Sequence, residues 1–473
     1  MSIDPVCGTK VDEACATFEE RDGRKFYFCS DSCRQKFLLA PEGKFASRWR
    51  RLKRLHAKGA LLYARLRPRA GRRLPEELRA EKVGSLAEGL AWGVRDDGFE
   101  KLIGRIEADT IHNGNRIQLF FRGEEAFSSV IRDIEGAKDE ILLETYILKD
   151  DDTGRKLLGV LGTAAARGVK VRVLADACGS WNTKREFWRK MQDMGIEAHL
   201  FHPFWSNFRN LLFRDHRKII VIDRRISFTG GMNVANEYGF LRRRRGRSFR
   251  DTHVRVEGPA AWEMALVFGE GWERSGGASL HLPPLVRNDT NGVRTMVLDS
   301  RSGRGHGEMA AVLAALVSAS RKRLWIANSY FAPNRTAIRL LARAARRGVD
   351  VRLLLQGPSD IPLVRHAGHG NYSELLAGGV RIFEYQSAVL HAKTIVADDY
   401  VTVVGSSNLD FRSFYFNAEC NVLIFDDASG QAMSRSFLED LGRSMEIRIE
   451  SWNRRPLMHR CFDAAAHCLS PLL

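Results

Sequence analysis

The sequence predicts an α/β protein with two similar halves behind a small cysteine-rich module. Short apolar runs rich in β-branched residues alternate with helical segments, as expected of sheets covered by helices. The block 140–176 recurs as 323–356, with a buried strand, a helix ended by glycine and a second buried strand in the same order. Four of the eight cysteines lie within the first 33 residues. These observations predict an internal duplication preceded by a separate N-terminal unit.

Length and composition exclude some classes of protein. The chain has 473 residues, enough for about two to four domains, and its 44% hydrophobic and 28% charged residues exclude global disorder. Its net charge of +17 favours a polyanionic partner, either nucleic acid or an anionic membrane surface. No apolar run reaches the roughly 18 residues of a spanning helix, and the first residues do not resemble a secretory signal. We therefore expect a cytoplasmic protein.

Three cysteines form a candidate metal site in the N-terminal module. Cys29 and Cys33 are four residues apart, so both sulfurs face one side of a turn that enters a helix, and Cys7 lies in the preceding tight turn. Three thiolates brought together would suit Zn²⁺ or Cu⁺, whereas three buried thiols in a small core are the alternative. So short a module usually needs a metal, a disulfide or a partner, and we expect no disulfide scaffold in a reducing compartment.

The residues around these cysteines follow a recognisable pattern. It consists of Asp4-Pro5-Val6-Cys7-Gly8, Tyr27-Phe28-Cys29-Ser30, Cys33 and Lys36-Phe37. Over residues 1–45 the pattern resembles a YHS domain of the heavy-metal-binding TRASH type. The resemblance implies that Cys7, Cys29 and Cys33 bind a metal, Zn or Cu, through their thiolates. Cys15 is a candidate fourth ligand.

A basic connector, predicted to span residues 46–109, follows the module. Residues 48–73 contain no Asp or Glu. A cationic helix here would carry an apolar stripe of Trp49, Leu52, Leu55, Leu62 and Leu66. Such a helix can lie on an anionic bilayer, with its Lys and Arg side chains reaching the headgroups. A linker helix packed on its own protein is the equal alternative.

The two halves carry the same polar motif. The first contains His216-Arg217-Lys218, then Asp223 and Gly230-Gly231-Met232-Asn233; the second contains His391-Ala392-Lys393, then Asp398 and Gly405-Ser406-Ser407-Asn408. In each copy His and Lys are two residues apart on an expected strand, so both side chains point to one face. A lone histidine on a strand is usually structural, but chance is a poor explanation for two copies at one spacing.

This paired motif supplies the groups that phosphodiester chemistry needs. Two lysines and two asparagines donate hydrogen bonds to the non-bridging phosphate oxygens. A neutral imidazole can attack phosphorus and form a phosphohistidine. A second, protonated imidazole can give a proton to the leaving alkoxide and then deprotonate an incoming alcohol or water. Because fixed cations neutralise the phosphate, we expect catalysis to need no cofactor.

Two acids are candidates to orient the histidines. Asp251 follows the first motif and Glu419 the second, each at the start of an apparent strand. Nucleophile–base arrays need such an orienting partner, and a charge at a strand edge is the alternative for either acid. Asp223 and Asp398, which lie inside the repeated motifs, are expected to be structural rather than chemical.

The duplicated motif resembles that of the phospholipase D superfamily over residues 110–473. The resemblance implies two α/β/α domains with mixed sheets, 110–280 and 281–473, and one active site at their interface. It gives the catalytic set as His216, Lys218, Asn233, Asp251, His391, Lys393, Asn408 and Glu419. The family takes its nucleophile from one motif and its acid from the other. We assign attack to His216 and proton donation to His391, an order that the sequence alone leaves open.

Further segments resemble bacterial cardiolipin synthases: residues 113–123, 144–150, 236–238, 251–259, 328–333 and 406–413. The resemblance implies transfer of a phosphatidyl group between two phosphatidylglycerol molecules, giving cardiolipin and glycerol. Many such synthases begin with membrane-spanning helices, whereas this chain begins with the YHS-like module. We therefore expect peripheral binding to the cytoplasmic face of the inner membrane, with anionic phospholipids as partners. The oligomeric state stays open.

An aromatic segment before His216 favours lipid over nucleic acid. Phe201, Phe204, Trp205, Phe208 and Phe213 suit a bilayer anchor or a lipid-tail channel, and a core-packing loop is the alternative. The arginines 242–245 are expected either to meet headgroups or to form a solvated charge run. A nuclease would also be basic but would present a polar groove with stacking aromatics. A phospholipid hydrolase is thus the closer alternative, and a non-catalytic metal-regulated membrane protein the remote one.

Overall fold

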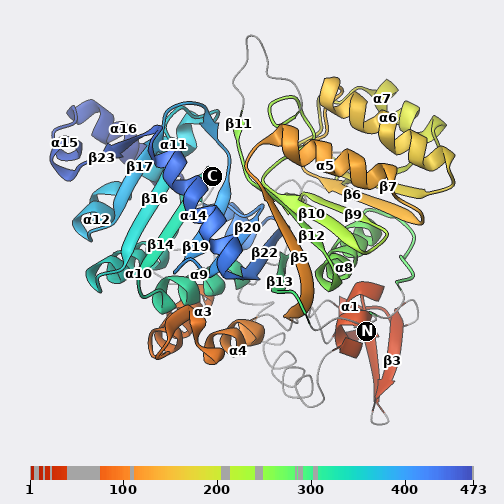
Figure 1. Cartoon of the computed structure of the whole chain (residues 1–473), viewed down its shortest axis with the longest axis horizontal. Helices are drawn as coiled ribbons and strands as arrows, with labels where there is room; N and C mark the ends of the chain where they lie inside the picture. Colours follow the sequence, from red (N-terminus) through yellow and green to blue (C-terminus); the bar gives the residue numbers. More distant parts are fainter. Residues whose placement is uncertain are drawn as a thin grey trace.

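One mixed sheet of 15 strands runs through the centre of the molecule (Figure 1). The computed structural model describes residues 2–4, 10–13, 16–21, 24–39, 75–106, 111–203, 213–239, 249–282, 285, 291–301 and 307–470. The predicted α/β class, with mixed strand directions and a small N-terminal module, is confirmed. In these residues no helix is both long enough and apolar enough to cross a bilayer.

The first half contributes seven strands and four helices to the layers around the sheet. The strands are β5 (His112–Phe120), β6 (Glu140–Thr145), β7 (Lys170–Asp176), β8 (Glu197–Phe201), β9 (Ile219–Ile222), β10 (Ile226–Gly230) and β12 (His253–Glu257). The helices are α5 (Gly123–Glu135), α6 (Asp152–Ala166), α7 (Arg185–Asp193) and α8 (Pro259–Arg274). Helices α5 to α7 cover one face and α8 the other (Figure 1), so β6 and β9 are buried along their whole length.

The second half repeats this plan. Its strands are β13 (Val293–Ser300), β14 (Arg323–Asn328), β16 (Asp350–Gln356), β17 (Arg381–Tyr385), β19 (Lys393–Ala397), β20 (Val401–Gly405), β22 (Glu419–Phe425) and β23 (Ser444–Ile447). Its helices are α9 (Glu308–Ala319), α10 (Arg335–Arg346), α11 (Pro362–His369), α12 (Tyr372–Ala377), α13 (Phe411–Tyr415), α14 (Asp427–Leu441), α15 (Ile449–Asn453) and α16 (Leu457–Cys468).

Equivalent helices of the two halves begin and end in the same way. Asp151 caps α6 by accepting from the Gly154 N–H, and Asn334 caps α10 by accepting from the Ala337 N–H. Gly168 and Gly348 follow these helices with φ of +91° and +92°, a conformation that glycine adopts without strain. The predicted duplication is therefore visible in the backbone as well as in the motifs.

The two half-sheets are joined edge to edge. The strand order is β23-β17-β16-β14-β19-β20-β22-β13-β5-β12-β10-β9-β6-β7-β8, and β13 and β5 pair antiparallel at the join. Sequence analysis predicted two domains with mixed sheets, and in the structure the sheets of the two halves pair edge to edge as one continuous sheet. A buried layer formed by both halves crosses this join, since Val254 and Val256 of β12 belong to the same cluster as Val297 of β13 and Val422 of β22.

Short segments of each half also reach into the other half. Strand β11 (Phe249–Arg250) pairs parallel with β18 (Val389–Leu390). Asp215 forms a parallel bridge with Ala418, and the His216 N–H donates to the Ala418 carbonyl at 2.9 Å. A further pair, β15 (Phe331–Ala332) and β21 (Leu409–Asp410), lies within the second half. The backbone around each motif is thus fixed by the opposite half.

The segment between the module and the first half is helical where the structure describes it. Helix α3 (Pro75–Glu88), the 3₁₀ helix η1 (Gly93–Arg95) and α4 (Asp97–Ile106) pack against α9. Ala80, Phe99 and Ile103 are buried there in the core of the second half. The basic stretch 48–73 of the predicted connector lies outside the described residues.

The N-terminal module packs against the first half (Figure 1). Its strands are β1 (Ser2–Ile3), β2 (Lys10–Val11), β3 (Thr17–Arg21) and β4 (Arg24–Phe28), followed by α1 (Asp31–Leu39). Helix α1 contacts α8, and Gln35 Nε2 donates to the Leu282 carbonyl at 3.3 Å. This placement brings the two described cysteines of the module to the catalytic body.

Candidate active site

The two His-Lys motifs lie where the halves join. His216 and Lys218 immediately precede β9, whereas His391 precedes β19 and Lys393 begins it. The sequence predicted both residues of each pair on a strand; the structure places His216, Lys218 and His391 in the segments that lead into the strands. The buried apolar residues after each lysine anchor these segments in the sheet. All four side chains are buried.

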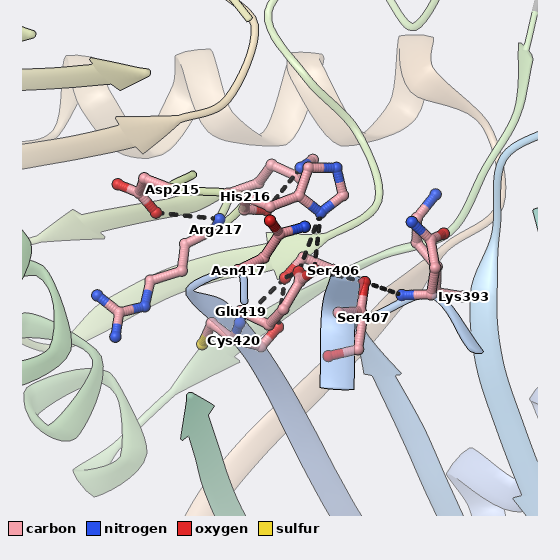
Figure 2. Close-up of polar contacts among 12 residues, drawn as sticks. Asp215, His216, Arg217, Lys393, Ser406, Ser407, Asn417, Glu419 and Cys420 are labelled. Carbon is pink, nitrogen blue, oxygen red and sulfur yellow. Dashed lines mark hydrogen bonds and ion pairs between the residues drawn. The ribbon is translucent and has the colours of Figure 1, made fainter. Parts of the chain in front are cut away.

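Each histidine is held by the acid of the other half. Nδ1 of His216 lies 3.1 and 3.0 Å from the two carboxylate oxygens of Glu419 (Figure 2). Nδ1 of His391 lies 2.7 Å from Asp251 Oδ2. Along the chain each acid follows the histidine of its own half, so this crossing is not apparent from the order of the motifs. With Nδ1–H donated to a carboxylate, Nε2 is the nitrogen available for chemistry.

The acids are themselves positioned by neighbouring groups. Glu419 accepts hydrogen bonds from the hydroxyls of Ser406 at 2.5 Å and Ser413 at 2.7 Å (Figure 2). Asp251 Oδ1 accepts from the Thr252 N–H at 2.7 Å. A Cβ added to Gly231 would lie 2.2 Å from Asp251 Oδ1, so only glycine allows Asp251 to approach. Ser406 and Ser413 are site residues that sequence analysis did not single out.

The two lysines supply positive charge to a shared site. Burial lowers the pKa of Lys218 to about 7 and that of Lys393 to about 8. Lys218 Nζ donates to the His216 carbonyl at 2.6 Å, and Lys393 Nζ donates to Ser329 Oγ at 2.8 Å. Burial lowers the pKa of His216, and Lys393 of the other half contributes to that shift. The two motifs therefore act on one another electrostatically.

The two asparagines have different partners. Asn233 Oδ1 accepts from the Ile147 N–H at 3.1 Å, and its Nδ2 donates to Tyr238 Oη at 3.2 Å. Asn408 Oδ1 accepts from Ser329 Oγ at 2.8 Å. Each asparagine thus fixes the loop that follows the first strand of its repeated block. The hydrogen bond from Asn233 thus positions the hydroxyl of Tyr238, which lies beside His391.

Three tyrosines border the histidines and were missed by sequence analysis. The Tyr146 ring meets His216 edge-on at 5.0 Å between centroids, and the Tyr330 ring meets His391 at 6.1 Å. Tyr238 Oη lies 3.3 Å from His391 Nε2. Tyr146 and Tyr330 follow equivalent strands of the repeated block, so the duplication itself carried a signal for this pair.

Asp223 and Asp398 lie at the opposite ends of their strands from the histidines. Asp223 accepts from the backbone N–H groups of Lys138, Asp139 and Glu140 at 2.8–3.0 Å. Asp398 accepts from those of Arg321, Lys322 and Arg323 at 2.8–2.9 Å. Both have positive φ, near +50°. In each half these hydrogen bonds join the turn that holds the aspartate to the backbone at the start of the neighbouring strand. They are the contacts expected of a structural residue.

A buried ionic cluster surrounds Arg217, the residue that follows His216. The buried Arg217 guanidinium lies 3.3 Å from Asp299, 3.6 Å from Glu144 and 4.0 Å from Glu270, and donates to the Ser300 carbonyl at 2.9 Å. Burial raises the pKa of Glu144 well above its usual value. Removal of one partner from such a cluster would leave an uncompensated buried charge, which is unfavourable. The ion pairs therefore fix Arg217, and with it the neighbouring His216.

The module's cysteines form a second polar cluster. Cys29 Sγ and Cys33 Sγ are 3.7 Å apart, and Asp4 Oδ2 accepts from the Cys29 N–H at 2.8 Å. The Asp4 carboxylate and both sulfurs lie within 4.8 Å of one another. Two thiols and one carboxylate form a donor set that fits Zn²⁺. The sequence analysis did not propose Asp4 as a ligand, and Cys7 and Cys15 lie outside the described residues.

The remaining predicted membrane segments are described only in part. Residues 204–212 and the arginines 242–245 lie outside the described residues. Phe201 is buried in the same core cluster as Trp262 and Trp272. For this residue the structure agrees with the alternative prediction, a residue that packs in the core. The Phe213 ring lies tilted against the Phe416 ring, with centroids 5.8 Å apart.

The duplicated α/β fold and the paired His-Lys motifs at one interface define a phospholipase D-like protein. The family model for the PLD-like domain of cardiolipin synthase matches residues 130–241 and 312–441, and the YHS domain model matches residues 2–49. The chain therefore belongs to the cardiolipin synthase family of phospholipase D-like proteins and carries an N-terminal YHS domain. Both sequence-based resemblances are confirmed, as is an enzyme of the phosphatidyltransferase type.

Relatives cover most of the chain. It is 34% identical over 383 residues to a cardiolipin synthase of Geobacillus sp. (strain WCH70), covering 79% of this chain and 75% of the relative. It is 31% identical over 440 residues to cardiolipin synthase 1 of Bacillus cereus (strain ATCC 14579), covering 90% and 84%. The crystal structure of phosphatidylserine synthase from Haemophilus influenzae Rd KW20 shares the fold, with a TM-score of 0.62, 14% identity and coverage of 84% of this chain and 100% of that chain.

Titration of the buried lysines predicts that kcat/KM falls on the alkaline side of the pH profile. Because burial lowers the pKa of Lys218 to about 7 and of Lys393 to about 8, both are cations below these values and lose charge above them. Phosphate binding should weaken accordingly, so kcat/KM measured in neutral detergent micelles should fall as the pH rises from 7 to 9. Lys218→Arg, whose guanidinium stays charged, should move this fall toward the pKa of Lys393. A flat profile from pH 6 to 9 would contradict this account.

Proposed function

We propose that this protein transfers a phosphatidyl group from one phosphatidylglycerol to a hydroxyl of a second, giving cardiolipin and glycerol. The observation that supports this best is the crossed pair of buried carboxylate–imidazole contacts, Glu419 with His216 and Asp251 with His391. It provides two oriented imidazoles in one basic site, as a double displacement at phosphorus requires. Relatives that carry the name cardiolipin synthase over most of the chain support the choice of substrate.

In the first half-reaction His216 Nε2 attacks phosphorus. A P–N bond forms, the P–O bond to glycerol breaks, and His391 gives its proton to the leaving alkoxide. Burial lowers the pKa of His216, which keeps it neutral for attack. Burial lowers the pKa of His391 too, but the negative charge of the bound phosphodiester opposes that shift and favours the protonated ring.

In the second half-reaction His391 takes the proton from the hydroxyl of the second phosphatidylglycerol. The new alkoxide attacks phosphorus, the P–N bond breaks, and His216 is regenerated. Lys218 and Lys393 neutralise the phosphate in both steps, so no metal acts at phosphorus in this scheme. Tyr238 Oη, 3.3 Å from His391 Nε2, lies where it can hold that nitrogen toward the leaving or entering oxygen.

Water competes with the alcohol for the same intermediate, so a phospholipid hydrolase is the alternative function. Its product would be phosphatidic acid instead of cardiolipin. The catalytic residues are common to both reactions, and the acceptor depends on which hydroxyl reaches the phosphohistidine first. The assay below therefore reads the products as well as the rate.

The first prediction concerns the products made from phosphatidylglycerol vesicles. Mass spectrometry of the lipids should show cardiolipin and an equal amount of glycerol. His216→Ala and His391→Ala should each reduce turnover by at least about 10³-fold, because each removes a group that acts on the reacting atoms. His459→Ala, an exposed histidine of α16, is the matched control and should keep full activity. Phosphatidic acid as the main product would make the protein a hydrolase; unchanged turnover in both variants would exclude the mechanism.

We propose further that the enzyme binds its substrate membrane peripherally, by the edge at which the histidines lie. Trp181 is 70% exposed and Ile361 44%, and the two follow β7 and β16 at equivalent places in the repeat. The loop of Trp181 packs against Tyr146, since a Cβ on Gly179 would lie 2.1 Å from the Tyr146 carbonyl. Asp360, next to Ile361, accepts from Tyr330 Oη at 2.6 Å. Each exposed apolar side chain thus belongs to a loop that contacts the tyrosine bordering one of the histidines.

Charge at this edge suits an anionic bilayer. Lys184 and Arg185 are exposed close to Trp181, and Leu363 of α11 is exposed close to Ile361. Aromatic and aliphatic side chains can enter the interface while neighbouring cations meet the headgroups. Cytoplasmic membranes rich in phosphatidylglycerol present such a surface.

Acidic substitutions at this edge should separate membrane binding from chemistry. Trp181→Asp and Ile361→Asp should each weaken sedimentation with phosphatidylglycerol vesicles by about tenfold or more, because they remove an apolar contact and add repulsion. Turnover of a monomeric short-chain phosphatidylglycerol should be retained. Trp92→Asp is the control, because Trp92 is 78% exposed near Arg321 at the other end of the sheet. Equal vesicle binding by all three variants would rule out this surface.

We also propose that the cysteine cluster binds Zn or Cu and tunes the active site through Arg301. Arg301 Nη1 donates to Cys33 Sγ at 3.2 Å, and its Nε lies 2.7 Å from Glu270 of the ionic cluster around Arg217. Arg301 directly follows Ser300, which pairs with Glu419 in the sheet and accepts from the Glu419 N–H at 3.1 Å. A metal-bound thiolate would attract the Arg301 guanidinium and hold this end of β13.

Metal removal should therefore lower activity, and the effect should require Arg301. Chelation of the purified protein should reduce kcat by about two- to thirtyfold, the range of typical coupling energies between sites. Arg301→Gln should show the reduced kcat with or without metal. Arg274→Gln is the matched control, since Arg274 pairs with the same Glu270 at 3.5 Å but belongs to α8 and not to the end of β13. Equal kcat for metal-loaded and metal-free wild type would contradict the coupling.

A further inference from the structure

A group of metal-ligating side chains lies outside the catalytic site, between α11 and α16. His366 and His369 are three residues apart on α11 and face Asp463 of α16. One ring nitrogen of each histidine and one carboxylate oxygen of Asp463 lie within 4.8 Å of one another. The mechanism uses none of these residues, and neither family resemblance assigns them a role.

The hydrogen bonds of His369 cannot all be satisfied by a neutral ring. Its Nε2 lies 3.1 Å from Glu384 Oε1, and its Nδ1 lies 3.3 Å from Asp463 Oδ1. A neutral imidazole carries one N–H, so one of its nitrogens points a lone pair at a carboxylate oxygen. A metal ion bound by that nitrogen and the carboxylate oxygen would give the lone pair a partner. The same Asp463 oxygen also lies 2.7 Å from His366 Nδ1.

The surroundings are arranged as they are around many metal-binding histidines. Glu384 accepts the Nε2–H of His369, which leaves the Nδ1 lone pair for a metal. Glu384 is itself fixed by Arg365 at 2.8 Å and by Tyr372 Oη at 3.3 Å. Asp463 Oδ2 is held by Arg455 at 2.6 Å, which leaves Oδ1 as the ligand atom. Both acids are therefore kept ionised and oriented by arginines.

Spacing and access also suit a small divalent ion. Ligands about 2.0–2.1 Å from a tetrahedral Zn²⁺ are about 3.3–3.4 Å apart. The 3.3 Å between His369 and Asp463 matches that spacing, and the closer His366, whose side chain is 28% exposed, has room to turn outward. That exposed side gives the ion a path to the site and leaves a position for water.

We propose that His366, His369 and Asp463 bind a divalent cation of the Zn²⁺ type, with water as the fourth ligand. The ion would lie between His369 Nδ1 and Asp463 Oδ1 and join α16 to α11. Its role is structural, because its ligands are not members of the catalytic set and lie on two packed helices. The ion would fix α16, which also contacts α11 through Phe462 and through the bond between His467 and the Ala367 carbonyl.

The test is metal binding by the full chain with Zn²⁺ and Co²⁺. After equilibration with Zn²⁺ and gel filtration, elemental analysis should show one equivalent more in the wild type than in His369→Gln or Asp463→Asn. With Co²⁺, the thiolate charge-transfer absorption of the cysteine cluster should stay unchanged in these variants, so loss at the histidine site is distinguished from loss at the cysteines. His459→Gln, on the exposed face of α16, should bind as the wild type does.

A stability measurement guards against variants that disturb the helix itself. Zn²⁺ should raise the Tm of the wild type and of a Cys29→Ser variant, but should raise it less in His366→Gln, whose half-exposed side chain can be replaced with little effect on packing. Equal zinc content in the wild type, His369→Gln and Asp463→Asn would overturn the proposal. So would NMR evidence at neutral pH, in the presence of Zn²⁺, that His369 carries protons on both nitrogens.

Discussion

The structure depends on one interaction made twice, a carboxylate of one half bonded to the imidazole of the other. Glu419 reaches His216 and Asp251 reaches His391, so neither half contains a complete histidine–acid pair. The crossing explains why the two sheets are joined through β13 and β5 and why β11 pairs with β18. A shift of one half against the other by a single residue would separate both pairs. The site therefore requires one rigid body, which a continuous sheet provides.

Burial of so many charges at this join is costly unless each has a partner. Arg217 is surrounded by Asp299, Glu144 and Glu270, and Arg301 extends the same chain of charges to Cys33. Because each charge has a partner, the cluster contributes little net stability. Loss of one member would leave a buried charge without an opposite charge in a low-dielectric interior, which is destabilising. Such clusters favour one arrangement over others. The N-terminal module contacts the catalytic body at this point, through the hydrogen bond between Arg301 and Cys33.

Sequence analysis predicted the fold class because the pattern of strands and helices is repeated, and most of its candidate site residues lie together in the structure. Two copies of one spacing identified the histidines, lysines and asparagines, and the alternation of buried strands and glycine-ended helices indicated the layers. It could not predict that the half-sheets join, since edge pairing between β13 and β5 leaves no periodic pattern. Nor could it show which acid serves which histidine: Asp251 lies closer in sequence to His216 but bonds His391. Ser413 and Tyr238 act through tertiary contacts that no local motif records.

One difference between the two copies of the motif carries information about roles. Gly231 of the first half corresponds to Ser406 of the second; the glycine makes room for Asp251, whereas the serine donates to Glu419. Burial raises the pKa of Asp251 to about 6. Burial would also raise that of Glu419, but His216, Lys218 and Ser406 outweigh it and lower the pKa. Environments that separate the pKa values of paired groups usually separate their tasks. A carboxylate that stays ionised stabilises the positive ring of a phosphorylated His216, which favours His216 as the nucleophile and leaves proton transfer to His391.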